Sequence, residues 1–109
     1  MEISADSRAL AQDLLDFIDA SPSPWHAVET VAERLQHSGF VALREDERWQ
    51  LAAGGRYYVI RGGSSIIAFA VGSAALAESG FRLIGAHTDS PGLRVKPKAL
   101  QAGDGLLRL

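Results

Sequence analysis

The spacing of apolar residues divides the chain into a helical first third and a strand-like remainder. Over residues 7–20 the apolar positions recur at helical spacing, and the aspartates fall mostly on the other side of the helical wheel. This pattern predicts an amphipathic helix. Its apolar positions are Leu10, Leu14, Phe17 and Ile18.

The serine and proline run at residues 21–24 predicts where this helix ends and the next one begins. Each proline lacks an amide donor and restricts the residue before it, which favours a turn. Ser23 can cap a second helix that has Pro24 in its first position. Gly39 supplies a left-handed residue that closes this helix near Ser38. We expect its buried positions to be Ala27, Val28, Val31, Ala32 and Leu35.

After the second helix, the chain carries short runs of β-branched and aromatic residues separated by glycines, which predict strands. Residues 65–71 are apolar on both faces, which is typical of a central strand. Residues 94–97 alternate as a strand does, but Pro97 cannot donate to a ladder, and residues 103–105 predict a turn. The predicted strands are residues 40–43, 56–61, 65–71 and 81–86.

The last four residues, 106–109, form an apolar run without a turn, a cap or a polar tail. Such a run is typical of a segment that continues into a strand, because an exposed apolar end favours aggregation. We therefore expect the chain to be a piece of a longer protein. A naturally short chain with an apolar tail is the alternative.

Composition and charge exclude several classes of partner. The 109 residues are 47% hydrophobic and 22% charged, as in an ordinary globular protein. A net charge of -2 lacks the basic excess that binding to nucleic acid requires. No apolar stretch approaches the ~20 residues of a membrane-spanning helix, and the first residues do not resemble a secretory signal. We expect a cytoplasmic protein with no nucleic-acid and no membrane partner.

The absence of cysteine narrows the possible metal ligands to His, Asp and Glu. The informative stretch is residues 83–92, in which an apolar run leads into a polar loop. In extended backbone His87 and Asp89 share a face, and Thr88 points the other way. One ring nitrogen of His87 could then bind a metal while Asp89 accepts the proton on the other nitrogen. A His–Asp pair that only stabilises its loop is the structural alternative.

The other two histidines are expected to have structural roles. His26 lies at the predicted start of the second helix, where it can bond to nearby backbone. His37 lies near the predicted end of that helix, where a positive charge interacts favourably with the helix dipole. Neither is included in the predicted site.

Two segments resemble the aspartyl aminopeptidases, a family of binuclear zinc exopeptidases: SPSPWHAV at residues 21–28 and GAHTDSPGLRVKP at residues 85–97. The resemblance extends over essentially the whole chain. It implies that His87 is a zinc ligand and that Asp89 is its supporting catalytic carboxylate. It also implies that the remaining ligands and the general base lie beyond Leu109.

The resemblance further implies an α/β, three-layer zinc-exopeptidase-like fold, with two helices packed on a mixed sheet. Residues 1–109 would be the N-terminal part of the catalytic domain, ending near the start of an inserted second domain. The implied activity is that of a metallo-aminopeptidase. By the resemblance, two zinc ions would hold a hydroxide that attacks the first peptide bond of a peptide substrate and so removes an N-terminal acidic residue, Asp or Glu. Family members form large homo-oligomers, so the full-length protein is expected to self-associate.

A catalytic zinc normally takes three protein ligands, and this chain offers one convincing donor, so the chain alone is expected to be inactive. Two other functions stay open. The chain could be a non-enzymatic interaction or assembly module derived from a peptidase fold. It could also be half of a split enzyme whose other chain supplies the missing ligands.

Overall fold

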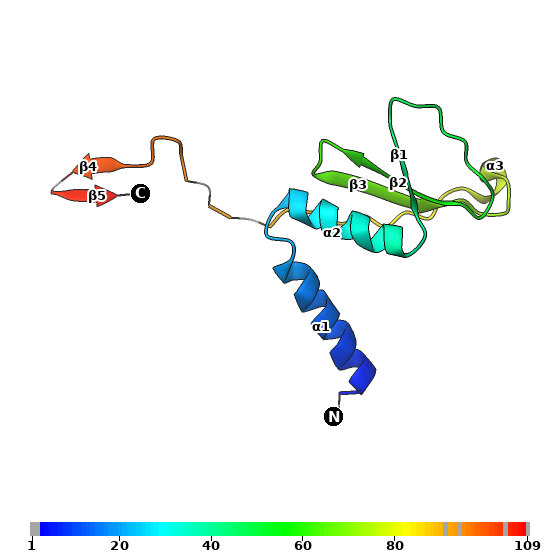
Figure 1. The fold of residues 1–109 in the computed structure, drawn as a ribbon, viewed down its shortest axis with the longest axis horizontal. Coiled ribbons are helices and arrows are strands. Elements are labelled where there is room, and N and C mark those ends of the chain that lie inside the picture. Colours follow the sequence, from blue (N-terminus) through cyan, green and yellow to red (C-terminus); the bar gives the residue numbers. More distant parts are fainter. Residues whose placement is uncertain (1–2, 91, 94, 104, 109) are drawn as a thin grey trace.

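The structure is a computed structural model that describes residues 3–90, 92–93, 95–103 and 105–108. A compact body carries two projecting parts, an N-terminal helix and a C-terminal hairpin (Figure 1). The elements in chain order are α1 (Ala5–Asp19), α2 (Pro24–His37), β1 (Val41–Leu43), β2 (Arg56–Arg61), β3 (Ser65–Ala70), α3 (Leu76–Ser79), β4 (Gln101–Gly103) and β5 (Leu106–Arg108).

The central sheet is mixed, which confirms the predicted α/β class. Its strand order is β1-β2-β3, with β1 parallel and β3 antiparallel to β2. The bounds of β2, residues 56–61, are those that the sequence predicts. β4 and β5 form a separate antiparallel hairpin, of which β5 falls within the predicted run 106–109.

One face of the sheet is covered by α2. The side chains of Ala27, Val28 and Ala32 are buried, whereas Val31 and Leu35 are only partly covered. The same face is tied to α2 by a hydrogen bond of 2.6 Å in which Gln36 Nε2 donates to the hydroxyl of buried Tyr58. This helix is therefore the main hydrophobic partner of the sheet.

On the other face of the sheet, Trp49 of the loop between β1 and β2 packs against aromatic side chains of the strands. Trp49 stacks on Phe69 with ring centroids 6.1 Å apart, and Tyr57 lies 5.7 Å from the same ring. The amide of Ala52 donates to the Tyr57 hydroxyl at 3.0 Å. β2 is consequently buried from both sides, which is the property of a central strand.

The ends of α2 confirm the predicted caps. Ser23 is the N-cap and its hydroxyl accepts from the amide of His26 at 3.4 Å, while Pro24 is the first helical residue. Gly39 adopts a φ of 80°, a conformation that a residue with a Cβ rarely takes, and it follows the C-cap residue Ser38. Local chemistry alone therefore determines both ends of this helix.

α1 differs from the prediction in its start and its packing. It begins at Ala5, two residues earlier than predicted, because the hydroxyl of Ser4 caps the amide of Ser7 at 3.1 Å. Among the described elements, α1 contacts α2 and not the sheet, so the expectation that both helices pack on the sheet is wrong. The physical reason is the turn at residues 21–23, which directs α1 away from the body (Figure 1).

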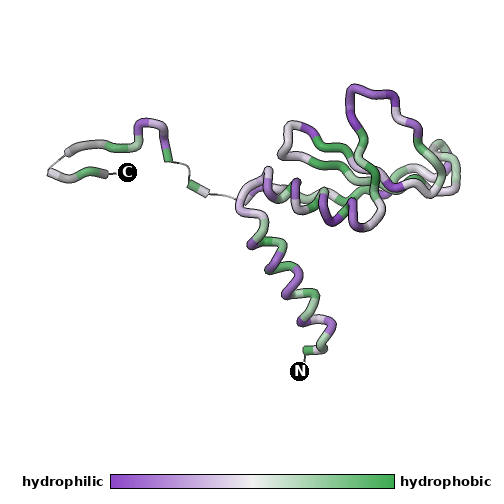
Figure 2. Tube along the Cα trace, in the orientation of Figure 1, coloured by the Kyte–Doolittle hydropathy of each residue, from purple (hydrophilic) through white to green (hydrophobic). Residues whose placement is uncertain are grey.

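An ion pair and a cation–π contact join α1 to α2. Arg34 Nη1 lies 2.8 Å from Asp13 Oδ2, and the guanidinium lies 5.4 Å from the centre of the Phe17 ring. Apolar and polar positions alternate along α1 in Figure 2, as the helical spacing predicts. No residue of α1 is buried in the described structure.

The prediction that residues 65–71 form a central strand is wrong in position, although β3 itself is confirmed. β3 is an outer strand of the described three-stranded sheet, and β2 is the central one. Side chains on β3 therefore remain accessible, and Ile67 is 66% exposed. Apolar residues on both faces show that a strand could be buried on both sides. They do not show whether the described part of the structure covers it.

Residues 81–86, which the sequence predicts to be a strand, are not in a strand in the structure. A strand needs a neighbouring edge for its backbone hydrogen bonds, and these residues pair with none of the described strands. Their apolar side chains are accordingly exposed, with Ile84 at 99%. Residues 95–97 are not in a strand either, and Arg94, Asp104 and Leu109 lie outside the described residues. Within the described part of the chain, no helix has the length and apolar character needed to cross a membrane.

Val28 is the most completely buried side chain of the core, at 2% exposure, and gives a test of this packing. We expect Val28→Ala to lower the free energy of unfolding by about 1–2 kcal/mol, because the lost contacts outweigh the higher helix propensity of alanine. Val95→Ala, the same change at an exposed site, should lie within about 0.5 kcal/mol of the wild type. Urea unfolding followed by tryptophan fluorescence measures both. Equal values for the two variants would contradict the assigned core.

Candidate metal site

His87 and Asp89 lie on the loop that follows residues 81–86, and both are open to solvent. Nδ1 of His87 lies 2.7 Å from the backbone oxygen of Asp89 and 3.2 Å from its Oδ1. The side chains are 79% and 69% exposed. The imidazole is therefore held by its neighbour without being buried.

This contact determines which ring nitrogen could bind a metal. A carbonyl oxygen can only accept a hydrogen bond, so Nδ1 carries the proton and donates it to Asp89. In the neutral ring, Nε2 then has a free electron pair, which is the form that a histidine ligand needs. The arrangement fits zinc, because neutral imidazole and carboxylate are among its usual protein ligands. The ligand role of His87 and the supporting role of Asp89 stay predictions.

The described residues do not form a complete metal site. A zinc site needs three or four protein donors, and the described part of the chain contains no group of three or more His, Asp or Glu side chains able to hold a metal. The other histidines make local contacts: His26 Nδ1 lies 2.7 Å from Ser23 Oγ, and His37 Nδ1 lies 2.7 Å from the backbone oxygen of Glu33. The contact of His26 is local, but its partner is a side-chain hydroxyl and not the backbone that the sequence analysis expected.

The structure connects the His87 loop to the sheet through Thr88, a contact that the sequence analysis missed. Thr88 Oγ1 donates to the backbone oxygen of Ser64 at 2.9 Å, and Ser64 lies in the loop between β2 and β3. The alternation that places Thr88 opposite His87 and Asp89 was visible in the sequence. Its partner was not, because Ser64 is 24 residues away.

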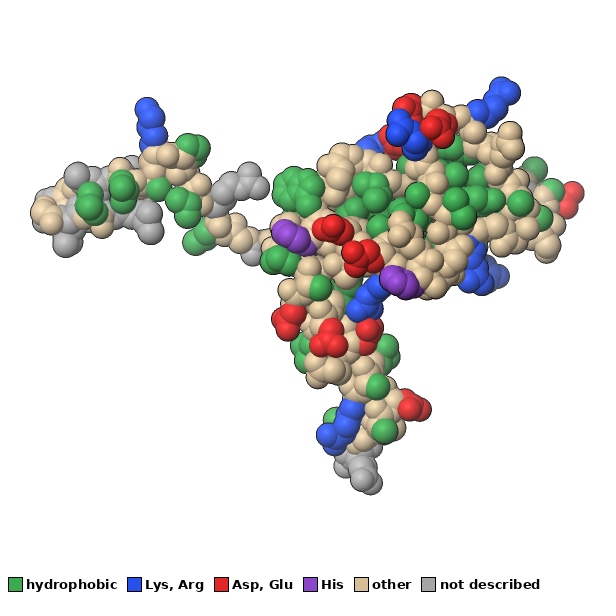
Figure 3. Space-filling view, in the orientation of Figure 1, with side chains coloured by type: hydrophobic (Ala, Val, Ile, Leu, Met, Phe, Trp, Pro, Cys, Tyr) green, Lys and Arg blue, Asp and Glu red, His purple; other side chains and the backbone are tan. Residues whose placement is uncertain are grey.

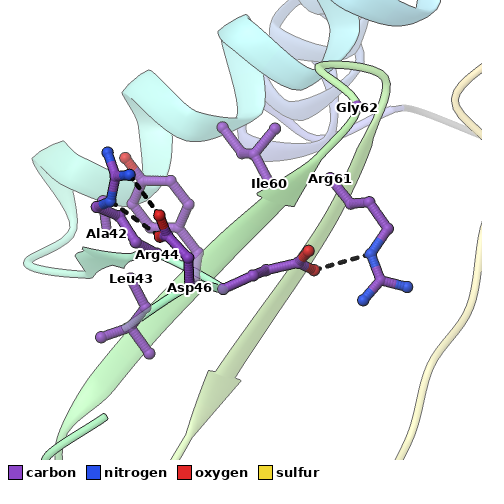
Figure 4. Close-up of a pocket in the computed structure, with 9 residues that line it drawn as sticks. Ala42, Leu43, Arg44, Asp46, Ile60, Arg61 and Gly62 are labelled. Carbon is purple, nitrogen blue, oxygen red and sulfur yellow. Dashed lines mark hydrogen bonds and ion pairs between the residues drawn. The ribbon is translucent and has the colours of Figure 1, made fainter. Parts of the chain in front are cut away.

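A second candidate site is an open, charged groove of about 320 Å³ between the start of the β1–β2 loop and β2 (Figure 4). Its charges are paired within the protein, and acidic and basic side chains lie together over the β1–β2 loop in Figure 3. Arg61 Nε lies 2.8 Å from Glu45 Oε1, and Arg44 lies 2.7 Å from Asp46 Oδ2 and 3.1 Å from Glu47 Oε1. Exposed pairs of this kind contribute little to stability, and here they leave no unpaired charge to attract a ligand.

The Arg44–Asp46 pair gives a pH prediction. The hydrogen bond from Arg44 holds the pKa of the Asp46 carboxyl below its usual value. A carboxyl whose pKa is lower in the folded state contributes its stabilisation above its unfolded pKa and loses it as the pH falls through the folded pKa. We expect Arg44→Gln to raise the pKa of Asp46, measured by carbon-13 NMR titration. Arg48→Gln should leave it unchanged, and an equal response to both variants would contradict the pairing.

The fold is α/β, and an exposed His87–Asp89 pair lies on the loop after residues 81–86. The sequence model of the family described as "Aminopeptidase I zinc metalloprotease (M18)" matches residues 17–109. The chain belongs to this family. The family resemblance that was based on residues 21–28 and 85–97 is thereby confirmed.

Curated relatives support the same family over most of the chain. The chain is 53% identical over 100 residues to the "Probable M18 family aminopeptidase 2" of Pseudomonas paraeruginosa (strain PA7). The aligned region covers 92% of this chain and 23% of the relative. The chain is 57% identical over 89 residues to the protein of the same description in Stutzerimonas stutzeri (strain A1501), covering 82% and 21%. The chain thus spans less than a quarter of the length of these relatives.

Solved structures of similar proteins extend the match to the fold. The structure titled "Cryo-EM structure of the Ape4 and Nbr1 complex" matches with a TM-score of 0.78 and 42% identity, over 98% of this chain and 22% of that one. The dodecamer of mApe1 from Saccharomyces cerevisiae matches with a TM-score of 0.52 and 38% identity, over 56% and 15%. The α/β fold is therefore that of M18 aminopeptidases.

Proposed function

We propose that residues 1–109 are the N-terminal part of the catalytic domain of a zinc-dependent aminopeptidase, and that they end near the start of an inserted second domain. The proposed substrate is a peptide whose N-terminal residue, Asp or Glu, is removed. Membership of the M18 family supports the reaction class. The observation that carries the site is the Nδ1 contact of His87 with Asp89, which leaves Nε2 free to bind a metal.

The residues of this chain would prepare the site. His87 would hold one zinc ion through Nε2, and Asp89 would keep the proton on Nδ1 and increase the basicity of the ring. When bound, zinc supplies an activated water at neutral pH and polarises the scissile carbonyl. The exposed position of His87 leaves room around the ring for further ligands and for the peptide.

The other ligands and the general base would come from residues beyond this chain. Two zinc ions are proposed for the complete site, and His87 would bind only one of them. One histidine does not hold a catalytic zinc with high affinity, because three protein ligands are the usual number. The 109-residue chain by itself is therefore expected to bind zinc weakly and to hydrolyse no peptide.

The test compares the full-length protein with the isolated chain. Metal analysis should find two zinc ions per subunit of the full-length protein, and N-terminal aspartyl and glutamyl peptides should be hydrolysed faster than leucyl peptides. The isolated chain should show no turnover on any of them. Turnover by the isolated chain would contradict the proposal that its active site is incomplete. A metal-free and inactive full-length protein would overturn the proposed activity and favour the interaction module instead.

We also propose that the full-length protein is a cytoplasmic homo-oligomer. The mApe1 structure that this chain resembles is titled a dodecamer, and 38% identity to it supports a similar subunit fold. Light scattering coupled to size-exclusion chromatography of the full-length protein tests self-association. A monomer at micromolar concentration would contradict it.

A further inference from the structure

The His87–Asp89 contact orients the ring within its own loop but does not attach that loop to the fold. Both partners belong to one three-residue segment, and both side chains are exposed. The preceding residues 81–86 pair with no described strand. A metal ligand has to be held to within about 0.5 Å of its working position, so some other contact must place the loop.

Thr88 makes that contact. Its hydroxyl donates to the backbone oxygen of Ser64 at 2.9 Å, and both residues are half-buried, unlike His87 and Asp89. Among the described residues of the structure, this is the hydrogen bond that connects residues 81–90 to the loop or the strands of β2 and β3. A half-buried hydrogen bond competes with less water than an exposed one and so restrains the loop more effectively.

The acceptor is itself held in place. Ser64 belongs to the three-residue loop between the last paired positions of β2 and β3, Arg61 and Ser65. In this loop Gly62 and Gly63 have φ values of 60° and 70°, which favour glycine. The ladder therefore fixes both ends of the loop that presents the Ser64 oxygen.

The start of α2 supports the same loop from another direction. A Cβ built on Gly63 would lie 3.2 Å from Trp25 Cδ1, so the indole packs directly against this glycine. Trp25 is the second residue of α2, directly after Pro24. The two signature segments of the sequence, residues 21–28 and 85–97, thus meet through the β2–β3 loop, with Trp25 on Gly63 and Thr88 on Ser64.

We propose that Thr88 is a positioning residue for the metal site, which places the His87 ring by anchoring its loop to the Ser64 oxygen of the β2–β3 loop. Because the backbone alternates, a bond from Thr88 to the fold leaves His87 and Asp89 directed away from it. This inference rests on the proposed function, since it assumes that His87 is a metal ligand.

The experiment uses three variants of the full-length protein. Thr88→Val keeps the shape of the side chain and removes the hydroxyl, Thr88→Ala removes the hydroxyl without any risk of a clash, and Thr88→Ser restores it. We expect the first two to weaken zinc binding roughly tenfold, which is the low end of the effect of losing a partner outside the ligand set. Their cobalt-substituted forms should show an altered visible absorption spectrum. Thr88→Ser should match the wild type in both measurements.

Two outcomes separate this inference from the proposed function. If His87→Ala keeps the full zinc content, His87 is not a ligand and the proposed site fails. If His87→Ala loses zinc while Thr88→Val and Thr88→Ala keep the zinc affinity and the cobalt spectrum of the wild type, the anchoring role of Thr88 is overturned and the site stands. Melting temperatures close to that of the wild type confirm that the variants are folded. Rescue by serine distinguishes the hydrogen bond from general packing.

Discussion

Replacing His87 by alanine should remove zinc from the site and reduce peptide hydrolysis by the full-length protein more than about 100-fold, the upper range for partners outside the ligand set. The reason is that alanine has no donor to replace Nε2, which the contact of Nδ1 with Asp89 leaves available for metal. Equilibrium dialysis with zinc and steady-state kinetics on an aspartyl peptide measure both effects.

His37→Ala is the matched control for this prediction. His37 is also exposed, and its Nδ1 lies 2.7 Å from the backbone oxygen of Glu33, four residues earlier in α2. The same loss of an imidazole there should leave zinc content and turnover within about twofold of the wild type, as for most surface changes. Equal zinc content and equal rates in the His87→Ala variant would remove the site assignment.

Asp89→Asn should lower the zinc affinity of the full-length protein roughly 10–100-fold. The substitution preserves shape but removes the negative charge that lies 3.2 Å from His87 Nδ1. The backbone oxygen at 2.7 Å remains, so the tautomer should be kept while the ring becomes a weaker base. Zinc titration against a chelator measures the affinity.

The control for Asp89→Asn is Asp19→Asn, the same change at an exposed position at the end of α1. It should leave the zinc affinity unchanged. An Asp89→Asn variant with the affinity of the wild type would show that the backbone oxygen alone orients His87. In that case the carboxylate would have no supporting role.

The sequence predicts only those features of the candidate site that lie within one short segment of the chain. His87, Thr88 and Asp89 are neighbours in the chain, so alternation along extended backbone is enough to group His87 with Asp89 and to separate Thr88 from them. The contact of Thr88 with Ser64 joins residues 24 positions apart. No local pattern encodes such a contact, because it depends on how the β2–β3 loop and the His87 loop meet.

The helices and strands also divide into features that local sequence predicts and features that depend on long-range contacts. The caps of α2 at Ser23 and Gly39 follow from side-chain chemistry within a few residues, and the structure confirms them. The limits of β2 likewise coincide with the glycines at positions 55 and 62, which flank its run of aromatic and β-branched residues.

The position of each element in the fold was decided by tertiary contacts. Residues 65–71 were predicted to be central because they are apolar on both faces. The central strand is instead β2, which α2 and the β1–β2 loop contact from opposite sides. α1 has the amphipathic spacing of a sheet-packing helix, and yet it contacts α2 through Arg34 and Asp13.

By itself, then, the sequence determined the presence of α1 and α2, the caps of α2, the bounds of β2, the family and the pairing of His87 with Asp89. All of these depend on residues a few positions apart or on the order of residues in a motif. Only the tertiary structure decided the strand order, the direction of α1, the absence of a strand at residues 81–86 and the anchor of Thr88 on Ser64. Each of these depends on which distant surface is available to cover an apolar face or to satisfy a backbone group.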